Sequence, residues 1–360
     1  MQKYPKPAPS ECFAKIHPLP YDEAMDKVSV AIIGLGYWGP HLLRNFCAQK
    51  GCRMKYGCDL NDENIAKASA QYPAVTYVKD ADAILADPEV ELVLIATPTS
   101  SHFPLAKKAL EAGKHVFIEK PVCTSSVEAT ELMTIAGKNG KMIFVDHTFA
   151  FAPSVTKMRE FAESGTLGDL LYFDSTRINL GIIQPDTNVL WDLAIHDLTI
   201  LNIVKDLRRV KELCAHGSMF YGTQTEVAHL HMTFDDGFMA HISVSWLSPV
   251  KIRHTILAGT KAMVTYDDTE PSEKIRLYDK GVTGESERPN PMLPTYRSGD
   301  VVIPALPSKE TLALEAEHVL ACVRSGENPR VGIGEGLTIL RILEKANESV
   351  ASKKAVTLLS

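Results

Sequence analysis

Short apolar segments alternate with longer amphipathic segments between residue 28 and about residue 150. The apolar segments predict strands at Val28–Ile33, Arg53–Cys58, Glu91–Ala96, His115–Ile118 and Met142–Val145. The amphipathic segments predict helices near residues 40–49, 62–71, 101–112 and 125–138. Strands that alternate with helices form βαβ units, which build a parallel sheet with right-handed crossovers. This part of the chain is therefore predicted to be an α/β domain with a doubly wound parallel sheet.

After residue 150 the pattern changes. Helices near 154–163 and 189–203 enclose a strand near 170–179, and several strands then follow one another between about 209 and 267. Strands without intervening helices favour antiparallel pairing. We therefore expect a C-terminal α+β domain with a large, mostly antiparallel open sheet. The Pro-, Gly- and charge-rich residues 268–308 predict a long irregular connection, and two helices near 309–325 and 335–351 follow it.

One hairpin of this sheet can be predicted in detail. Apolar residues alternate along both arms, at Ala228, Leu230, Met232 and Phe234, then at Phe238, Ala240, Ile242, Val244 and Trp246. A three-residue turn, Asp235–Gly237, keeps both apolar sets on one face and provides a glycine for a left-handed position. The same register places His231 opposite His241, so one face of the sheet is expected to cover helices and the other to be polar.

The length and composition limit the possibilities further. A chain of 360 residues exceeds the size of one hydrophobic core. We expect an N-terminal arm at 1–27, which contains five prolines, a nucleotide-binding domain at 28–150 and a substrate and oligomerisation domain at 151–360. A net charge of −6 argues against nucleic acid or an anionic membrane as a partner. Seven scattered cysteines without a CxxC pair, and no apolar run long enough to span a bilayer, predict a cytoplasmic protein.

A glycine-rich motif follows the first predicted strand. Gly34, Gly36 and Gly39 form a GxGxxG directly before a predicted helix, and Tyr37 and Trp38 lie within it. The three glycines permit a tight turn, the close approach of a pyrophosphate, and close packing of helix and strand. We therefore expect this loop, including Tyr37 and Trp38, to bind a dinucleotide at a helix N-terminus.

An acidic residue at the end of the second strand indicates which dinucleotide. Asp59 lies 20 residues after Gly39, where a carboxylate accepts hydrogen bonds from the adenosine ribose hydroxyls. No Arg or Lys follows until Lys67, so no cation is placed to neutralise a 2′-phosphate. The predicted cofactor is therefore NAD rather than NADP.

Two further strand ends carry polar residues. Thr97, Pro98 and then His102 follow the strand 91–96, and Glu119-Lys120-Pro121 follows the strand 115–118. Ligands of doubly wound sheets bind at these carboxyl ends. Pro121 favours an extended conformation for Lys120, which would direct its ammonium away from the strand. The alternative is that Glu119 and Lys120 are ordinary surface charges at a turn.

A third segment, residues 191–198, is predicted to be helical. Asp192 and His196 are four residues apart and so should share one face. They form either a local surface pair or a general base with a carboxylate beside it. Oxidation of a secondary alcohol needs a base for the hydroxyl proton, which histidine provides near pH 7, and a fixed cation such as Lys120 would stabilise the developing alkoxide.

Together, these motifs closely resemble the glucose–fructose oxidoreductase / inositol dehydrogenase / MocA family. The similarity covers GLGYWGP at 34–40, the Glu-Lys-Pro motif at 119–121, the Asp-x-x-x-His motif at 192–196 and the C-terminal segment, or about residues 28–358. The resemblance implies a Rossmann domain that binds NAD and a sugar dehydrogenase activity. It also implies that Lys120 contacts the nicotinamide ribose and the substrate, while Asp192 and His196 orient the sugar and exchange its proton.

Within the family, the chain is most similar to the nucleotide-sugar 3-dehydrogenases, through residues 177–181 and the sequence WDLAIHDL. This resemblance implies oxidation at C3 of a substrate such as UDP-N-acetylglucosamine or its uronate, giving a 3-keto sugar. Arg177 would then meet a phosphate or carboxylate of the substrate, with Asn179 beside it, or else form an ordinary salt bridge across the sheet. A dehydrogenase of free inositols or simple sugars and a non-catalytic NAD-binding regulator remain alternatives.

Three other features have simpler interpretations. His229, His231 and His241 share a polar face, but no carboxylate or cysteine joins them in the pattern, so we predict no metal site. Cys123 is expected to be a packed thiol, because hydride transfer needs no nucleophile. A broad sheet with a polar face also predicts self-association, as a dimer or tetramer.

Overall fold

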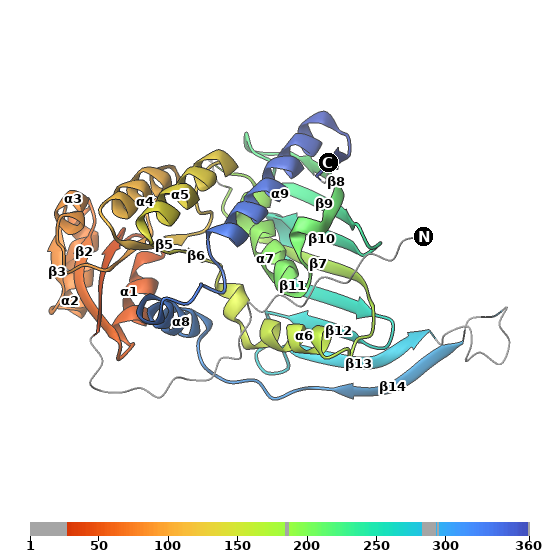
Figure 1. The fold of residues 1–360 in the computed structure, drawn as a ribbon. Coiled ribbons are helices and arrows are strands. Elements are labelled where there is room, and N and C mark those ends of the chain that lie inside the picture. The colour runs from red at the N-terminus through yellow and green to blue at the C-terminus, as the bar shows by residue number, and fades with distance from the viewer. Residues whose placement is uncertain (1–26, 184–186, 283–292, 294, 359–360) are drawn as a thin grey trace. The chain divides into compact units, whose positions relative to one another are not determined.

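The computed structural model describes residues 27–183, 187–282, 293 and 295–358. The predicted N-terminal arm lies outside them, except for its last residue. Two compact units make up the chain, and each is discontinuous in sequence (Figure 1). Unit 1 comprises the chain up to Glu119 together with Glu131–Asp146 and Ala313–Ile333. Unit 2 comprises Lys120–Thr130, His147–Leu312 and Gly334–Ser360.

Unit 1 contains a six-stranded parallel sheet with the order β3-β2-β1-β4-β5-β6. Its strands are β1 (Val28–Ile33), β2 (Cys52–Cys58), β3 (Thr76–Val78), β4 (Leu92–Ile95), β5 (His115–Glu119) and β6 (Ile143–Asp146). This is the strand order of a dinucleotide-binding Rossmann fold, so the predicted doubly wound sheet is confirmed. Every residue of β1 and β4 is buried, as expected for strands covered on both faces.

Helices follow the strands of this sheet in the predicted order. They are α1 (Gly39–Cys47), α2 (Asp62–Gln71), α3 (Ala81–Leu85), α4 (His102–Glu111) and α5 (Ser126–Asn139), and α8 (Thr311–Ser325) belongs largely to the same unit. The three-residue strand β3 and the five-residue helix α3 were not predicted, because segments this short show no clear hydrophobic period.

Unit 2 contains a nine-stranded sheet with the order β14-β13-β12-β11-β7-β10-β9-β8-β15. Its strands are β7 (Leu170–Leu180), β8 (Val210–Ser218), β9 (Val227–Phe234), β10 (Met239–Ser245), β11 (Leu247–Gly259), β12 (Met263–Asp267), β13 (Ile275–Val282), β14 (Tyr296–Val302) and β15 (Val356–Thr357). Among the described pairings of this second sheet, only β7 with β10 is parallel. The predicted, mostly antiparallel sheet is therefore confirmed.

One face of this sheet packs against α6 (Pro153–Glu163), α7 (Ile195–Val204) and α9 (Ile333–Ser352) (Figure 1). The hairpin β9–β10 has the predicted register, with His231 opposite His241, and Gly237 has a φ of +85° in its turn. Ala228, Leu230, Met232 and Phe234 are all buried against the helices, while the intervening residues face outward.

The prediction of an irregular connection at 268–308 was wrong in part, because β13 and β14 lie within it. They pair with each other and extend the sheet beyond β12. All seven residues of β14 are exposed, so this edge strand has no apolar alternation that a sequence pattern could reveal. Within the described residues, no helix is long and apolar enough to cross a membrane.

Candidate active site

The glycine loop of unit 1 connects β1 to α1 and has the geometry of a phosphate cradle. Gly34 has a φ of +98°, and a Cβ there would lie 2.5 Å from the carbonyl oxygen of Ala96. At Gly39 a Cβ would overlap the carbonyl oxygen of Gly34. Gly36, by contrast, has no neighbouring atom within 4 Å of its Cβ position, so open space lies where a pyrophosphate must approach. The loop therefore fits the predicted dinucleotide.

Asp59 lies one residue beyond β2 and contacts this loop directly. Its Oδ2 accepts the backbone N–H of Leu35 at 2.6 Å, and Asn64 Nδ2 donates to the same oxygen at 3.2 Å. Its Oδ1 accepts the N–H of Asn61 at 2.8 Å. These bonds hold the carboxylate beside the glycine loop, where a ribose would lie next to the pyrophosphate.

The other residues predicted to bind the cofactor lie at the same edge of the sheet, after β4 and at the end of β5. His102 is buried, and its Nε2 lies 2.8 Å from the carbonyl oxygen of Thr97, so it stabilises the chain after β4. Pro98 begins the following turn, and Glu119 ends β5 with a buried side chain. Tyr37 and Trp38, in contrast, are exposed at the surface of the glycine loop.

Unit 2 contains the second polar centre, built around Lys120. The Nζ atom of Lys120 donates to Oδ1 and to the main-chain oxygen of Asp192, at 3.2 Å each. Asp192 lies in a π-helical turn, Leu190–Ala194, that precedes α7. Such a turn contains more residues than an α-turn, bulges outward, and is frequent at functional sites. The turn thus presents the side-chain Oδ1 and the main-chain oxygen of Asp192 to the ammonium of Lys120.

Trp246 holds the other oxygen of the same carboxylate. Its Nε1–H donates to Asp192 Oδ2 at 3.0 Å, and its indole is fully buried. Asn179 lies beside this indole, since a Cβ on Gly181 would meet Asn179 Nδ2 at 3.0 Å and Trp246 Cδ1 at 2.9 Å. The structure therefore brings Lys120, Asp192 and Asn179 together around Trp246, which the sequence had indicated only as a core residue.

His196 follows the π turn, at the start of α7. Among the described residues, no hydrogen bond joins it to Asp192, whose carboxylate contacts Lys120 and Trp246 instead. The expected Asp–His pair is therefore absent, and Asp192 lies in a π turn rather than in an α-helix. The ring of His196 instead packs edge-on against Phe149, with centroids 5.1 Å apart. Burial, and then the positive charges of Lys120 and Arg177, hold the pKa of His196 well below its usual range. The imidazole is therefore neutral at pH 7.

His147 is a further member of this centre that sequence reasoning missed. It is buried, and its Nδ1 lies 2.9 Å from Thr199 Oγ1. Thr199 donates its only hydroxyl proton to the carbonyl oxygen of Ile195, so His147 must donate Nδ1–H to Thr199. Burial, and then Lys120, lower the pKa of His147 to about 3. The sequence offered one signal for His147: it directly follows the strand β6, just as Lys120 directly follows β5, and residues at the carboxyl ends of such strands are candidate ligand contacts.

Arg177 forms a buried ion pair rather than an open anion site. Its Nε and Nη2 donate to the carboxylate of Asp197 at 2.9 and 3.1 Å, and its side chain is 2% exposed. The guanidinium also stacks over Phe149, 4.7 Å from the ring centroid. Of the two predicted arrangements, the structure contains the salt bridge, although the partner lies on α7 and not across the sheet.

The outward histidines and the thiol of Cys123 do not resemble reactive groups. The rings of His231 and His241 stack at 4.5 Å, and His241 Nδ1 lies 3.0 Å from Asp174 Oδ2. In the described part of the chain, no group of three or more His, Cys, Asp or Glu residues is arranged to hold a metal ion. Burial raises the pKa of Cys123 to about 12, and its Sγ donates to the carbonyl oxygen of Ser125.

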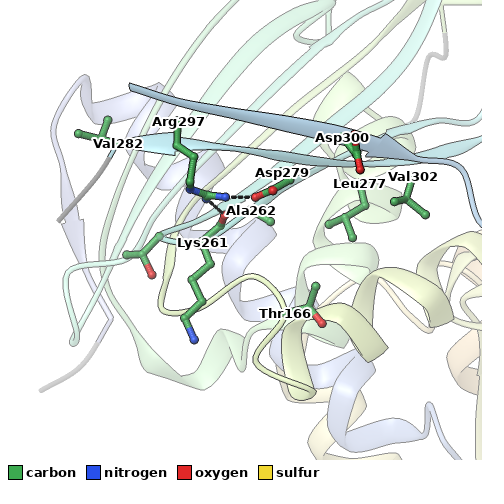
Figure 2. Close-up of a pocket in the computed structure, with 10 residues that line it drawn as sticks. Thr166, Lys261, Ala262, Leu277, Asp279, Val282, Arg297, Asp300 and Val302 are labelled. Atoms are coloured by element: carbon green, nitrogen blue, oxygen red, sulfur yellow. Dashed lines mark hydrogen bonds and ion pairs between the residues drawn. The ribbon is translucent and has the colours of Figure 1, made fainter. Parts of the chain in front are cut away.

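A cavity of about 570 Å³ lies elsewhere in unit 2, between β13, β14, the β11–β12 connection (residues 260–262) and Thr166. Figure 2 shows Arg297 reaching from β14 to Asp279 and to the main chain of Lys261 within it. None of Lys120, Asp192 and His196 lines this cavity. The candidate site is therefore the centre around Lys120, and not this cavity.

Two family models match the chain. One, described as "oxidoreductase family, NAD-binding Rossmann fold", matches residues 28–147, and the other, the "GFO/IDH/MocA C-terminal domain", matches residues 155–265. The chain belongs to the GFO/IDH/MocA family. Its residues 28–147 are thus an NAD-binding Rossmann domain of this family, and the prediction of NAD as cofactor is confirmed.

Curated relatives in this family act on different substrates. The UDP-N-acetylglucosamine 3-dehydrogenase of Acidithiobacillus ferrooxidans is 26% identical over 83% of this chain and 90% of its own length. The scyllo-inositol 2-dehydrogenase (NAD(+)) of Bacillus subtilis is 23% identical over 85% of this chain and 89% of its own length. The chain spans only about half the length of several other curated relatives, such as an uncharacterised Bacillus subtilis oxidoreductase, 29% identical over 51% of this chain and 53% of its own.

Solved structures share the fold at lower identity. GenD2 from gentamicin A biosynthesis, in complex with NAD, has a TM-score of 0.80 at 19% identity and covers 96% of this chain and 100% of its own. At this identity the likeness extends to the fold alone.

The open space at Gly36 generates a test of the cofactor loop. Gly36→Ala should leave the melting temperature unchanged, because the added Cβ meets no atom, yet weaken NADH binding at least about tenfold, because the methyl group occupies the approach of the pyrophosphate. Fluorescence titration with NADH measures this. Gly137→Ala, at an exposed position of α5 that also has no atom within 4 Å of the added Cβ, is the matched control. Unchanged NADH affinity in Gly36→Ala would refute this assignment of the loop.

Proposed function

We propose that the protein oxidises the C3 hydroxyl of a nucleotide-linked sugar, such as UDP-N-acetylglucosamine or its uronate, with NAD⁺ as hydride acceptor, and forms a 3-keto sugar. The observation that carries this proposal is the centre of unit 2, where a neutral histidine lies close to an ammonium held by a carboxylate. These are the groups that removal of a proton from a sugar hydroxyl needs.

In this proposal His196 is the general base. An imidazole accepts a proton only in its neutral form, and the low pKa of His196 keeps it neutral throughout the physiological range. NAD⁺, held by the glycine loop and Asp59, would supply the hydride acceptor, and His196 would accept the hydroxyl proton. The nearby positive charges of Lys120 and Arg177 then favour release of that proton, which readies His196 for the next turnover.

Lys120 and Asp192 act as a pair. The Lys120 ammonium stabilises the negative charge that develops on the substrate oxygen, as a fixed donor does in an oxyanion site. Asp192 orients this ammonium through two of its oxygens, and Trp246 orients Asp192. In this proposal Asn179, beside Trp246, hydrogen-bonds a neighbouring hydroxyl of the sugar.

Arg177 is not a substrate contact in this proposal, contrary to the first expectation. Asp197 already binds its guanidinium through two hydrogen bonds, and its buried position leaves it no exposed surface for a phosphate. Its contribution is electrostatic, through the lowered pKa of His196. The choice of a nucleotide sugar is therefore supported by the resemblance of the motifs and by the Acidithiobacillus relative.

A second candidate is a dehydrogenase of free inositols, which the Bacillus scyllo-inositol relative favours. We also propose that the protein is cytoplasmic, since its described cysteines are all free thiols, and that it forms a homo-oligomer. The outward face of the nine-stranded sheet supports self-association, because Tyr172, Met239 and Ile252 are exposed on it. No nucleic-acid or membrane partner is proposed.

A substrate panel tests the reaction. NADH formation at 340 nm should be fastest with UDP-N-acetylglucosamine or its uronate, and the product should be two mass units lighter than the substrate, as loss of two hydrogens requires. Free scyllo- and myo-inositol serve as the competing substrates. Preference for an inositol would support the second candidate. Tight NADH binding without turnover of any sugar would instead indicate a non-catalytic NAD-binding regulator.

Substitution of the proposed catalytic groups tests their roles. Lys120→Ala and His196→Ala should each lower kcat by about 10²–10⁴-fold, because each removes a group that acts on the reacting hydroxyl, while NADH affinity remains near the wild-type value. His216→Ala, which removes an exposed histidine from the outward face of β8, should retain full activity. Full activity in both Lys120→Ala and His196→Ala would contradict the mechanism.

A further inference from the structure

The connection between β8 and β9 presents a run of apolar side chains to solvent. Met219, Phe220 and Tyr221 are 61%, 63% and 81% exposed. Leu180 and Ile182, at the end of β7, are 78% and 80% exposed. The two segments approach each other closely, since a Cβ on Gly222 would lie 3.0 Å from Ile183 Cγ2. We refer to these five exposed residues as the apolar lip.

A buried carboxylate fixes the shape of this connection. Glu226 is fully buried, and it accepts the backbone N–H groups of three consecutive residues, Phe220, Tyr221 and Gly222. Bonds from N–H groups to a carboxylate are stronger than bonds between neutral groups. Phe220 and Tyr221 are thus presented from a rigid backbone. A binding surface that is already ordered loses little conformational entropy when a ligand arrives.

The same connection is joined to the candidate active site at two points. The backbone N–H of Trp246 donates to the carbonyl oxygen of Glu226 at 3.0 Å, and the indole of Trp246 holds Asp192. The N–H of Val189, the residue before the π turn, donates to the carbonyl oxygen of Thr225 at 2.9 Å. On the other side, the N–H of Gly181 donates to Trp246 O at 2.9 Å. The β8–β9 part of the lip (Met219–Tyr221) and the β7 part (Leu180 and Ile182) are therefore both attached to residues that position Asp192.

We propose that the apolar lip binds the nucleobase of a nucleotide-linked substrate, with Phe220 and Tyr221 stacking on the base. This inference rests on the proposed function, and it names the residues that recognise the part of the substrate beyond the sugar. In this arrangement the sugar ring would be held at Asp192 and Asn179, and the diphosphate would span from the sugar to a base stacked on the lip. Every nucleobase has a π-face, so aromatic side chains can stack on it whichever base the nucleotide carries. A free inositol has no group that could reach this lip.

Binding of UDP alone, without a sugar, tests the lip independently of turnover. Isothermal titration of UDP into the NADH-loaded protein should give an affinity about tenfold or more weaker for the double variant Phe220→Ala/Tyr221→Ala than for wild type, because two stacking surfaces are removed. The swap Phe220→Tyr/Tyr221→Phe keeps both rings and should bind UDP within about twofold of wild type. Tyr296→Ala removes an equally exposed tyrosine from β14, near the opposite edge of the sheet, and is the matched control.

Three results would overturn the inference. These are absence of UDP binding by the wild-type protein, equal UDP affinity in the double variant, and a change in oligomeric mass of the double variant without a change in UDP affinity. The last would assign the lip to a subunit contact. Failure of the proposed function looks different: UDP binding would depend on the lip, but no sugar would reduce NAD⁺. If the protein oxidises a nucleotide sugar but UDP binds the double variant as tightly as wild type, only the inference about the lip is refuted.

Discussion

The ion pair between Lys120 and Asp192 organises the polar centre of unit 2. One ammonium contacts both the side chain and the main chain of Asp192, at 3.2 Å each, and the π turn makes this double contact available. Trp246 occupies the remaining carboxylate oxygen, so the pair has a fixed orientation. Because the Asp192 carboxylate binds Lys120 and Trp246, it does not stabilise a positive charge on His196. Burial and the adjacent cations therefore lower the pKa of His196 and keep the imidazole neutral. The base and the cation of the proposed reaction thus depend on one arrangement.

In the proposed mechanism, the same arrangement connects the reacting groups to the apolar lip. Trp246 holds Asp192 through its indole and the β8–β9 connection through its backbone. Trp246 would therefore support both a ligand bound at the lip and a sugar bound at Asp192. The buried Glu226 fixes the backbone of this loop through its carboxylate, and its main-chain oxygen accepts the N–H of Trp246.

Sequence patterns predicted the parts of the structure that depend on local hydrophobic periods. The buried strands β1 and β4 and the β9–β10 register follow from such periods, and Gly34 and Gly39 follow from steric need. Features set by tertiary contacts were not predictable. Asp192 lies in a π turn rather than in the α-helix that its spacing to His196 implied, and Arg177 found its partner, Asp197, only through the packing of α7 on β7. The exposed strand β14 and the buried His147 gave no periodic signal at all.

The protonation state of His196 tests the central claim most directly. Nuclear magnetic resonance of selectively ¹⁵N-labelled histidine follows this imidazole as the pH is lowered, in wild type and in Lys120→Ala. Burial and then Lys120 disfavour the protonated form, so the wild-type ring should remain neutral through pH 6, and removal of the ammonium should raise the pKa of His196 toward its usual range. A wild-type His196 that titrates near pH 6.5, or a pKa that Lys120→Ala leaves unchanged, would contradict the account.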